Sequence, residues 1–144
     1  SRAAKSVWDR ADKHTRAKLG FSILEVVREN PTELRVRVDA NSPVQTFRHP
    51  DGVLFLTQFT QVAMAVLASA QVAELRESGV FVEGAITAGH SVGEYNALAA
   101  VTGVLTLEAV VEVVFQRGTV MHELVPRDAE GRSQPTDSTD AHSI

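Results

Sequence analysis

The sequence predicts a helix-rich α/β fold that contains a parallel sheet. Three observations lead to this class: several long segments have apolar residues at helical spacing, residues 80–88 form a mostly apolar run typical of a buried strand, and a Gly-x-Ser-x-Gly motif follows that run. We expect the sheet to be incomplete, because one clear strand and one uncertain strand stand among four or five helices. Apolar helix faces that would cover such a sheet are expected to leave exposed patches.

The N-terminal half begins with two predicted helices. Residues 1–19 have apolar positions near helical spacing, and Gly20 is well placed directly after the helix. Residues 21–30 carry a broad apolar face and end before Pro31, because the residue before a proline avoids helical geometry. Between 32 and 52 the pattern is weaker: the stretch ELRVRVDA alternates like a strand, and asparagine, proline and glycine indicate a long connection.

The C-terminal half has the predicted order helix, strand, sharp turn, helix, helix. Residues 57–79 are rich in alanine, leucine, methionine and glutamine, which favours a long and largely buried helix. The strand at 80–88 leads into the turn, and the stretch EYNALAAV after the turn is compatible with a helix. Thr106 is placed to cap a last helix, which ends before Pro126.

Composition narrows the function classes. The 144 residues suffice for one domain, and a net charge of -4 without a Lys/Arg cluster argues against nucleic acid as a partner. The absence of cysteine excludes disulfides, thiolate metal sites and a cysteine nucleophile, so the cytoplasm is the expected location. No apolar run approaches the roughly 18 residues that a membrane span needs, which argues against a membrane protein.

The Gly-x-Ser-x-Gly motif consists of Gly89, His90, Ser91, Val92 and Gly93. In a nucleophile elbow of this kind, the serine is exposed at the tip of a sharp strand-to-helix turn. The glycines leave room for the close approach of strand, helix and substrate. The N–H of Val92, at the start of the following helix, is the natural first donor to an acyl oxyanion. The alternative is a tight turn whose serine only caps the helix; the strand pattern before the motif favours catalysis.

Residue pattern alone assigns no catalytic role to Arg117 or Gln61. Arg117 shares a helix face with Val110, Val114 and Met121, which is typical of a surface arginine whose stem packs on apolar neighbours. For Gln61, the pattern indicates a polar residue on a helix surface.

Six short stretches carry a resemblance to a known family. VWDRAD, GFSIL, QFTQ, GHSVGEY, VVFQRG and VPRDAEGRS occur in the order in which they occur in the malonyl/palmitoyl transferase domain of the type I fatty acid synthases of fungi and actinobacteria. The sequence resembles this acyl-carrier-protein acyltransferase over nearly the whole of residues 5–133. The resemblance implies a partial, α/β-hydrolase-like acyltransferase subdomain, incomplete at both ends, over residues 1–133 with the elbow at 86–95. Residues 134–144 are expected to be a disordered polar tail.

The resemblance also implies the chemistry. Ser91 would take an acyl group such as malonyl from coenzyme A as an ester and pass it to the phosphopantetheine thiol of an acyl carrier protein. Arg117 would pair with the free carboxylate of a malonyl group, and Gln61 would line the pocket. Support of the elbow is implied for Gly89, His90, Gly93 and Glu94. The implied partners are acyl-CoA, the acyl carrier protein domain and the other synthase domains, with no bound cofactor or metal.

The base that would activate Ser91 is not found among the five histidines. His90 adjoins Ser91 and so points away from its hydroxyl, and His122 lies five residues after Arg117 on a different helix face. The family places its histidine farther downstream, beyond a small ferredoxin-like subdomain, and a second oxyanion donor in a loop before the first helix. We therefore expect a fragment with reduced or no activity alone. The alternatives are a serine esterase or thioesterase of the α/β-hydrolase type and a non-catalytic remnant.

Overall fold

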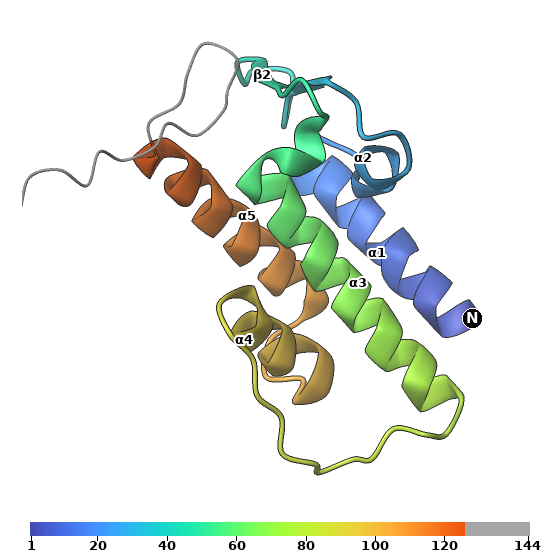
Figure 1. The fold of residues 1–144 in the computed structure, drawn as a ribbon. Helices are drawn as coiled ribbons and strands as arrows, with labels where there is room; N and C mark the ends of the chain where they lie inside the picture. Colours follow the sequence, from blue (N-terminus) through green and yellow to red (C-terminus); the bar gives the residue numbers. More distant parts are fainter. Residues whose placement is uncertain (126–144) are drawn as a thin grey trace, which may run out of the picture.

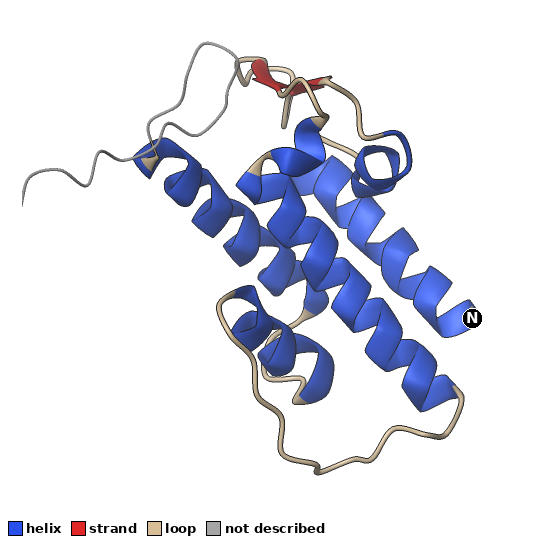
Figure 2. Cartoon of the chain, in the orientation of Figure 1, coloured by secondary structure: helices blue, strands red, loops and turns tan. Residues whose placement is uncertain are grey.

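Three long helices lie side by side in the computed structural model, which describes residues 1–125 (Figures 1 and 2). The elements in chain order are α1 (Arg2–Lys18), α2 (Ile23–Glu29), β1 (Glu33–Val36), β2 (Gln45–Arg48), the 3-10 turn η1 (Val53–Phe55), α3 (Thr57–Glu77), α4 (Val92–Asn96), the π-helical turn η2 (Ala97–Val101) and α5 (Leu107–Leu124). Helix α3 packs against both α1 and α5, while α4 contacts α3 and α5. The β1–β2 hairpin lies at one end of the long helices.

An aromatic cluster forms the core where the hairpin meets the long helices. The ring of Phe59 on α3 lies 5.0 Å from that of Phe21, 5.1 Å from that of Phe47 and 5.9 Å from that of Phe115, each with an edge-to-face orientation. Such pairs contribute about 0.5–1.5 kcal/mol each beyond the burial of their surface. The cluster therefore joins the segment before α2, strand β2, α3 and α5 into one core.

Buried Asp12 organises the junction between α1 and α2. Its carboxylate accepts hydrogen bonds from the Ser22 hydroxyl, from the N–H of Leu24 at 3.1 Å and from Arg16 Nε at 2.7 Å. Burial by itself raises the pKa of Asp12, but the hydrogen bonds from Ser22, Arg16 and Leu24 outweigh it and hold the pKa below its ordinary value. The ionised carboxylate therefore stabilises the start of α2.

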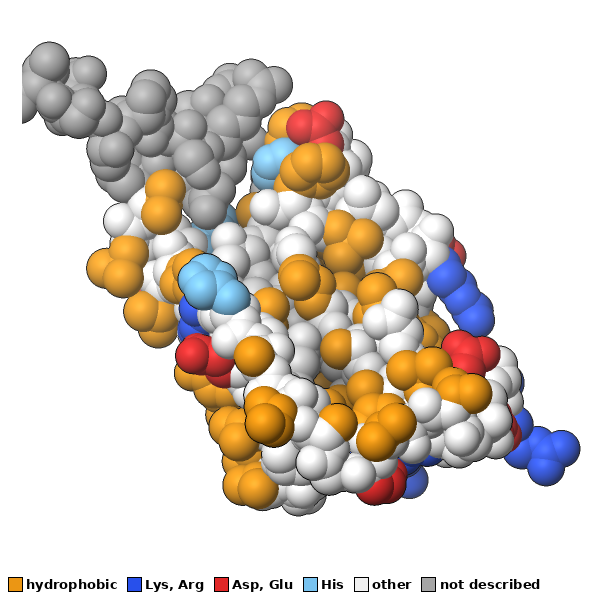
Figure 3. Space-filling model, turned by 60° about the horizontal axis from the view of Figure 1, so that its bottom comes forward, with side chains coloured by type: hydrophobic (Ala, Val, Ile, Leu, Met, Phe, Trp, Pro, Cys, Tyr) orange, Lys and Arg blue, Asp and Glu red, His pale blue; other side chains and the backbone are white. Residues whose placement is uncertain are grey.

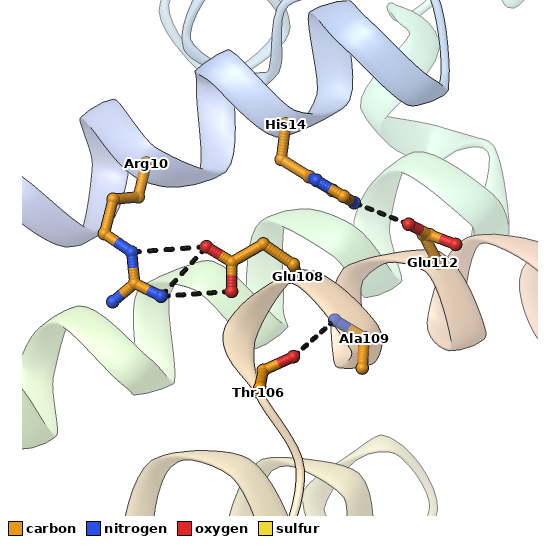
Figure 4. Close-up of polar contacts among 6 residues, drawn as sticks. All are labelled: Arg10, His14, Thr106, Glu108, Ala109 and Glu112. Carbon is orange, nitrogen blue, oxygen red and sulfur yellow. Dashed lines mark hydrogen bonds and ion pairs between the residues drawn. The ribbon is translucent and has the colours of Figure 1, made fainter.

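Two polar contacts join α1 to the first half of α5 (Figure 4). Arg10 Nη2 donates to both carboxylate oxygens of Glu108, at 2.9 and 3.0 Å, and His14 Nε2 lies 2.7 Å from Glu112 Oε1. Each pair has one partner whose side chain is about half exposed, Arg10 at 56% and Glu112 at 49%, so solvent screens both pairs and each contributes no more than about 1 kcal/mol. They set the alignment of two helices that the core already holds together.

The structure confirms most of the predicted helices. Those at 1–19, 21–30 and 57–79 are α1, α2 and α3, and the alternating stretch after Pro31 contains β1. The predicted cap of α5 is also confirmed: the Thr106 hydroxyl oxygen accepts from the N–H of Ala109 at 3.1 Å. The helix ends at Leu124, before Pro126. The predicted tail at 134–144, and with it the C-terminal end of the predicted domain, lies outside the described residues.

Residues 80–88 do not form the predicted strand, and the structure does not show the predicted parallel sheet within residues 1–125. Residues 80–88 are an extended, mostly exposed loop, and the one sheet within residues 1–125 is the antiparallel hairpin that pairs Glu33 with Arg48 and Val36 with Gln45. A strand requires neighbours for its backbone hydrogen bonds, and no other extended segment of the described chain lies beside 80–88. The apolar run therefore remains unpaired.

Exposed apolar side chains lie in the unpaired segment 80–88 and in the loop before α5. Ile86 is fully exposed, and Val82 and Val104 are exposed by 70% and 72%. Figure 3 views the molecule from the side of this loop and shows apolar side chains spread over that face. On the helices, Met64 and Leu67 of α3 and Val120 of α5 are exposed by 47%, 48% and 53%, in agreement with the expectation that apolar helix faces would be exposed. Within the described residues, no helix combines the length and the apolar character needed to cross a bilayer.

Candidate functional site

Ser91 occupies a sharp turn with an unusual backbone conformation. Its φ of 59° and ψ of -118° place a non-glycine residue at positive φ, which costs of order 1–3 kcal/mol. The turn is closed by hydrogen bonds from Gly93 N–H to the His90 carbonyl at 3.0 Å and from Glu94 N–H to the Ser91 carbonyl at 3.2 Å. The Ser91 side chain makes no capping bond to α4, so the interpretation of Ser91 as a helix cap is wrong.

Arg117 and Gln61 meet Ser91 at the interface of α3, α4 and α5. Arg117 Nη2 donates to Ser91 Oγ at 2.8 Å, and Nη1 donates to Gln61 Oε1 at 2.7 Å. The Gln61 amide nitrogen in turn lies 3.5 Å from the sulfur of Met121, which orients the amide oxygen toward Arg117. The Arg117 guanidinium carbon is 5.8 Å from the ring centroid of Tyr95. One arginine therefore connects the turn of α4 to α3.

These contacts decide between the alternatives left by the residue pattern. Gln61 is only 5% exposed, so its place on a helix surface is excluded. Arg117 is half-buried and uses its planar fork for two side-chain oxygens, unlike a surface arginine whose head is in water. A guanidinium that donates to Ser91 Oγ favours negative charge on that oxygen and also offers a fork that fits a carboxylate.

Two glycines permit close backbone approaches at the site. A Cβ on Gly89 would lie 2.3 Å from the carbonyl of Gly93, so the turn closes only with glycine at position 89. A Cβ on Gly93 would meet no atom within 4 Å. Gly118, which the sequence analysis missed, packs directly on α3: its Cβ would lie 2.4 Å from the Cα of Gln58. A glycine inside an 18-residue helix was the available signal, since glycine weakens a helix unless close packing requires it.

The other motif residues contribute to the turn and to the start of α4 mainly through their backbone atoms. The side chains of His90 and Glu94 are exposed, so His90 contributes its backbone carbonyl to the turn and Glu94 its backbone N–H. Val92 anchors α4, because the residue is only 8% exposed. Its N–H opens the helix and has no acceptor among residues 1–125, as an oxyanion donor requires.

The other three histidines of residues 1–125 lie in other surroundings. His14 pairs with Glu112 on the α1–α5 contact, and His49 accepts from the N–H of Asp51 at 3.1 Å. His122 lines a cavity between α5 and β2. The remaining histidine, at position 142, lies outside the described residues. Residues 1–125 also contain no cluster of three or more histidine, aspartate or glutamate side chains able to hold a metal ion.

Comparison with known proteins places this geometry in a family. The family described as acyl transferase domain matches residues 1–143. The chain is 39% identical to fatty acid synthase 2 of Mycosarcoma maydis, over 92% of this chain and 4% of that protein. It is 38% identical to the fatty acid synthase beta subunit stcK of Emericella nidulans, over 91% of this chain and 8% of the relative. It is also 38% identical to fatty acid synthase subunit beta of Saccharomyces cerevisiae, over 92% and 8%.

The chain matches only a small part of each of these relatives. The chain spans less than a tenth of their length. The alignments extend over 157 to 168 positions, so the relatives have residues inside the matched region that this chain of 144 residues lacks. The resemblance found in the sequence is confirmed: the chain belongs to the acyl transferase domain family and is a relative of the fungal fatty acid synthases.

Proposed function

We propose that this chain supplies the acyl-accepting part of an acyl-CoA to acyl-carrier-protein transacylase of fatty acid biosynthesis, with Ser91 carrying the acyl group. The observation that supports this most directly is the position of Arg117, which donates to both Ser91 Oγ and Gln61 Oε1 beside a strained turn. A guanidinium next to a nucleophile suits a substrate that carries a free carboxylate close to its reacting carbonyl, as malonyl-CoA does.

The reaction proceeds in two steps, acylation of Ser91 and transfer of the acyl group to the carrier protein. Ser91 Oγ attacks the thioester carbonyl, the carbon–sulfur bond breaks, and the proton of the hydroxyl passes through a general base to the departing thiolate of coenzyme A. The phosphopantetheine thiol of the carrier protein then attacks the ester carbonyl, the bond between the acyl carbon and Ser91 Oγ breaks, and the same base passes the proton of that thiol to Ser91 Oγ. The N–H of Val92 stabilises the oxyanion of both steps. The base and a second oxyanion donor come from parts of the synthase other than residues 1–125.

Arg117 and Gln61 divide the recognition of the substrate between them. The malonyl carboxylate binds the Arg117 fork, and the buried amide of Gln61 holds the guanidinium in place. An acetyl group offers no carboxylate and gains nothing from this fork. Segments outside this chain pair with residues 80–88 and complete an α/β-hydrolase-like parallel sheet in the cytoplasmic synthase. Gly89, His90, Gly93 and Glu94 shape the elbow through their backbone atoms.

Intact-protein mass spectrometry tests the proposal. The chain is incubated with malonyl-CoA or acetyl-CoA, and the added acyl group is measured over time. We expect slow malonylation of the chain alone, because the base comes from other parts of the synthase. This malonylation should disappear in Ser91→Ala and fall about 10- to 100-fold in Arg117→Ala, which loses one or two charge-assisted hydrogen bonds. Arg117→Lys is the matched control that keeps the charge and loses the fork.

Three outcomes count against the proposal. Absence of any adduct on a chain that is folded by circular dichroism indicates a remnant without activity of its own. Labelling that persists in Ser91→Ala assigns the acyl group to another residue. Hydrolysis of simple esters without preference for coenzyme A identifies an esterase instead.

A further inference from the structure

Arg76, in the last turn of α3, contacts the segment upstream of Ser91. Its Nε donates to Glu83 Oε1 at 2.8 Å, and its guanidinium carbon lies 4.6 Å from the ring centroid of Phe81. Both partners belong to the exposed loop between α3 and the turn. One side chain therefore holds this loop by an ion pair and by a cation–π contact.

The same guanidinium contacts the segment downstream of Ser91. Arg76 Nη1 donates to the carbonyl of Ala100 at 2.8 Å, and Nη2 donates to the carbonyl of Val101 at 3.0 Å. These carbonyls end the helical run Val92–Val101, whose last carbonyls have no partner within the helix. A cation at a helix C-terminus also interacts favourably with the helix dipole. Arg76 thus caps the far end of the helix that begins directly after Ser91.

Few interactions other than those of Arg76 hold residues 80–88, the flank upstream of Ser91. Val80, Val82 and Ile86 are exposed by 65%, 70% and 101%, so hydrophobic burial contributes almost nothing there. Within residues 1–125, the backbone hydrogen bonds of this flank are local ones, from the N–H of Val80 to the carbonyl of Leu75 and from the N–H of Ala85 to the carbonyl of Val82. Among residues 1–125, the side-chain interactions that tie the flank to a helix are those of Arg76 with Phe81 and Glu83.

We propose that Arg76 is a positioning residue for the nucleophile, because it fixes both flanks of the Ser91 turn to the end of α3. We define its contacts with Phe81, Glu83, Ala100 and Val101 as the Arg76 clasp. This inference rests on the proposed function, since a position for Ser91 has a consequence only if Ser91 reacts.

The clasp acts on Ser91 through the intervening helix. A helical run of ten residues is about 15 Å long, so a movement of its capped end is transmitted to the turn at its other end. Arg117 and Gln61 belong to α5 and α3 and do not follow that movement. Loss of the clasp therefore displaces Ser91 Oγ relative to Arg117, whereas the pocket for the carboxylate stays intact.

The test compares Arg76→Ala, Arg76→Lys and the matched control Arg10→Ala in the 144-residue chain. Arg10 also joins two elements through an ion pair with a glutamate, in this case Glu108 at the α1–α5 contact (Figure 4). Malonylation of Ser91 is measured at several malonyl-CoA concentrations. Hydrogen–deuterium exchange is measured for the amides of residues 92–101.

We expect Arg76→Ala to slow malonylation at saturating malonyl-CoA about tenfold and to leave the half-saturating concentration unchanged, because only the placement of the nucleophile is disturbed. Arg76→Lys should lose less, since lysine keeps the charge beside Glu83 but cannot bind two carbonyls and a carboxylate in one plane. Exchange in residues 92–101 should rise in Arg76→Ala and not in Arg10→Ala.

The clasp is overturned if Arg76→Ala malonylates like Arg10→Ala, or if its loss of rate equals its unfolded fraction. A wild-type chain that takes up no malonyl group contradicts the proposed function and not the clasp. Exchange alone then decides: equal exchange in the two variants rejects a role of Arg76 in holding the turn.

Discussion

Replacing Gly118 by alanine should destabilise the protein, although the same change stabilises most helices. The Cβ of an alanine at this position would lie 2.4 Å from Gln58 Cα, 2.7 Å from Gln58 N and 3.1 Å from Gln58 Cβ. Carbon atoms in contact are about 3.5–4.0 Å apart, so α3 and α5 must separate by about 1 Å. Overpacking of this kind costs about 1–3 kcal/mol, and the higher helix propensity of alanine returns at most about 1 kcal/mol.

Urea denaturation followed by circular dichroism measures the balance of these two effects. We expect Gly118→Ala to lower the free energy of unfolding by roughly 1–2 kcal/mol, which corresponds to a midpoint about 1 M lower in urea. Gly93→Ala is the matched control, because a Cβ there meets no atom within 4 Å. This control should be neutral or more stable by no more than about 1 kcal/mol.

Gly118→Ala should also disturb the contacts of the candidate site. Arg117 precedes Gly118 on α5, and Gln61 is one turn after Gln58 on α3, so a separation of the helices lengthens the 2.7 Å bond between Arg117 and Gln61. Malonylation should therefore fall in Gly118→Ala. The reasoning is refuted if Gly118→Ala is at least as stable as the wild-type chain, because the helices would then not be in contact at this point.

Two further predictions concern stability. Because the pKa of Asp12 is lowered in the folded chain, its carboxylate stabilises the fold above its unfolded pKa of about 4, and this contribution is lost as the pH falls through the lower folded value. Asp12→Asn should therefore unfold at lower urea than wild type at pH 7 and at nearly the same urea at pH 2, whereas a pH-independent difference contradicts the assignment. Thr106→Ala removes the bond to Ala109 N–H and should cost about 1 kcal/mol in the same titration, while Thr106→Ser keeps that acceptor; equal midpoints for these two variants exclude the cap.

The long helices were predictable because the information that forms them is local. Apolar residues at helical spacing and a capping Thr106 lie within one segment each, and α1, α3 and α5 appear where these patterns are. Whether residues 80–88 form a strand could not be predicted from local sequence. An apolar run becomes a strand only when neighbouring strands pair with it, and the described chain provides none.

The sequence by itself determined where the elbow is and which residues can do chemistry there. It placed Ser91 between two glycines ahead of a helix, and family resemblance singled out Arg117 and Gln61. Only the tertiary structure decided that these three residues meet, since Arg117 is 26 residues from Ser91 and 56 from Gln61. The contact depends on how closely α3 and α5 approach at Gly118. Such an approach is a property of two packed surfaces, and neither helix encodes it alone.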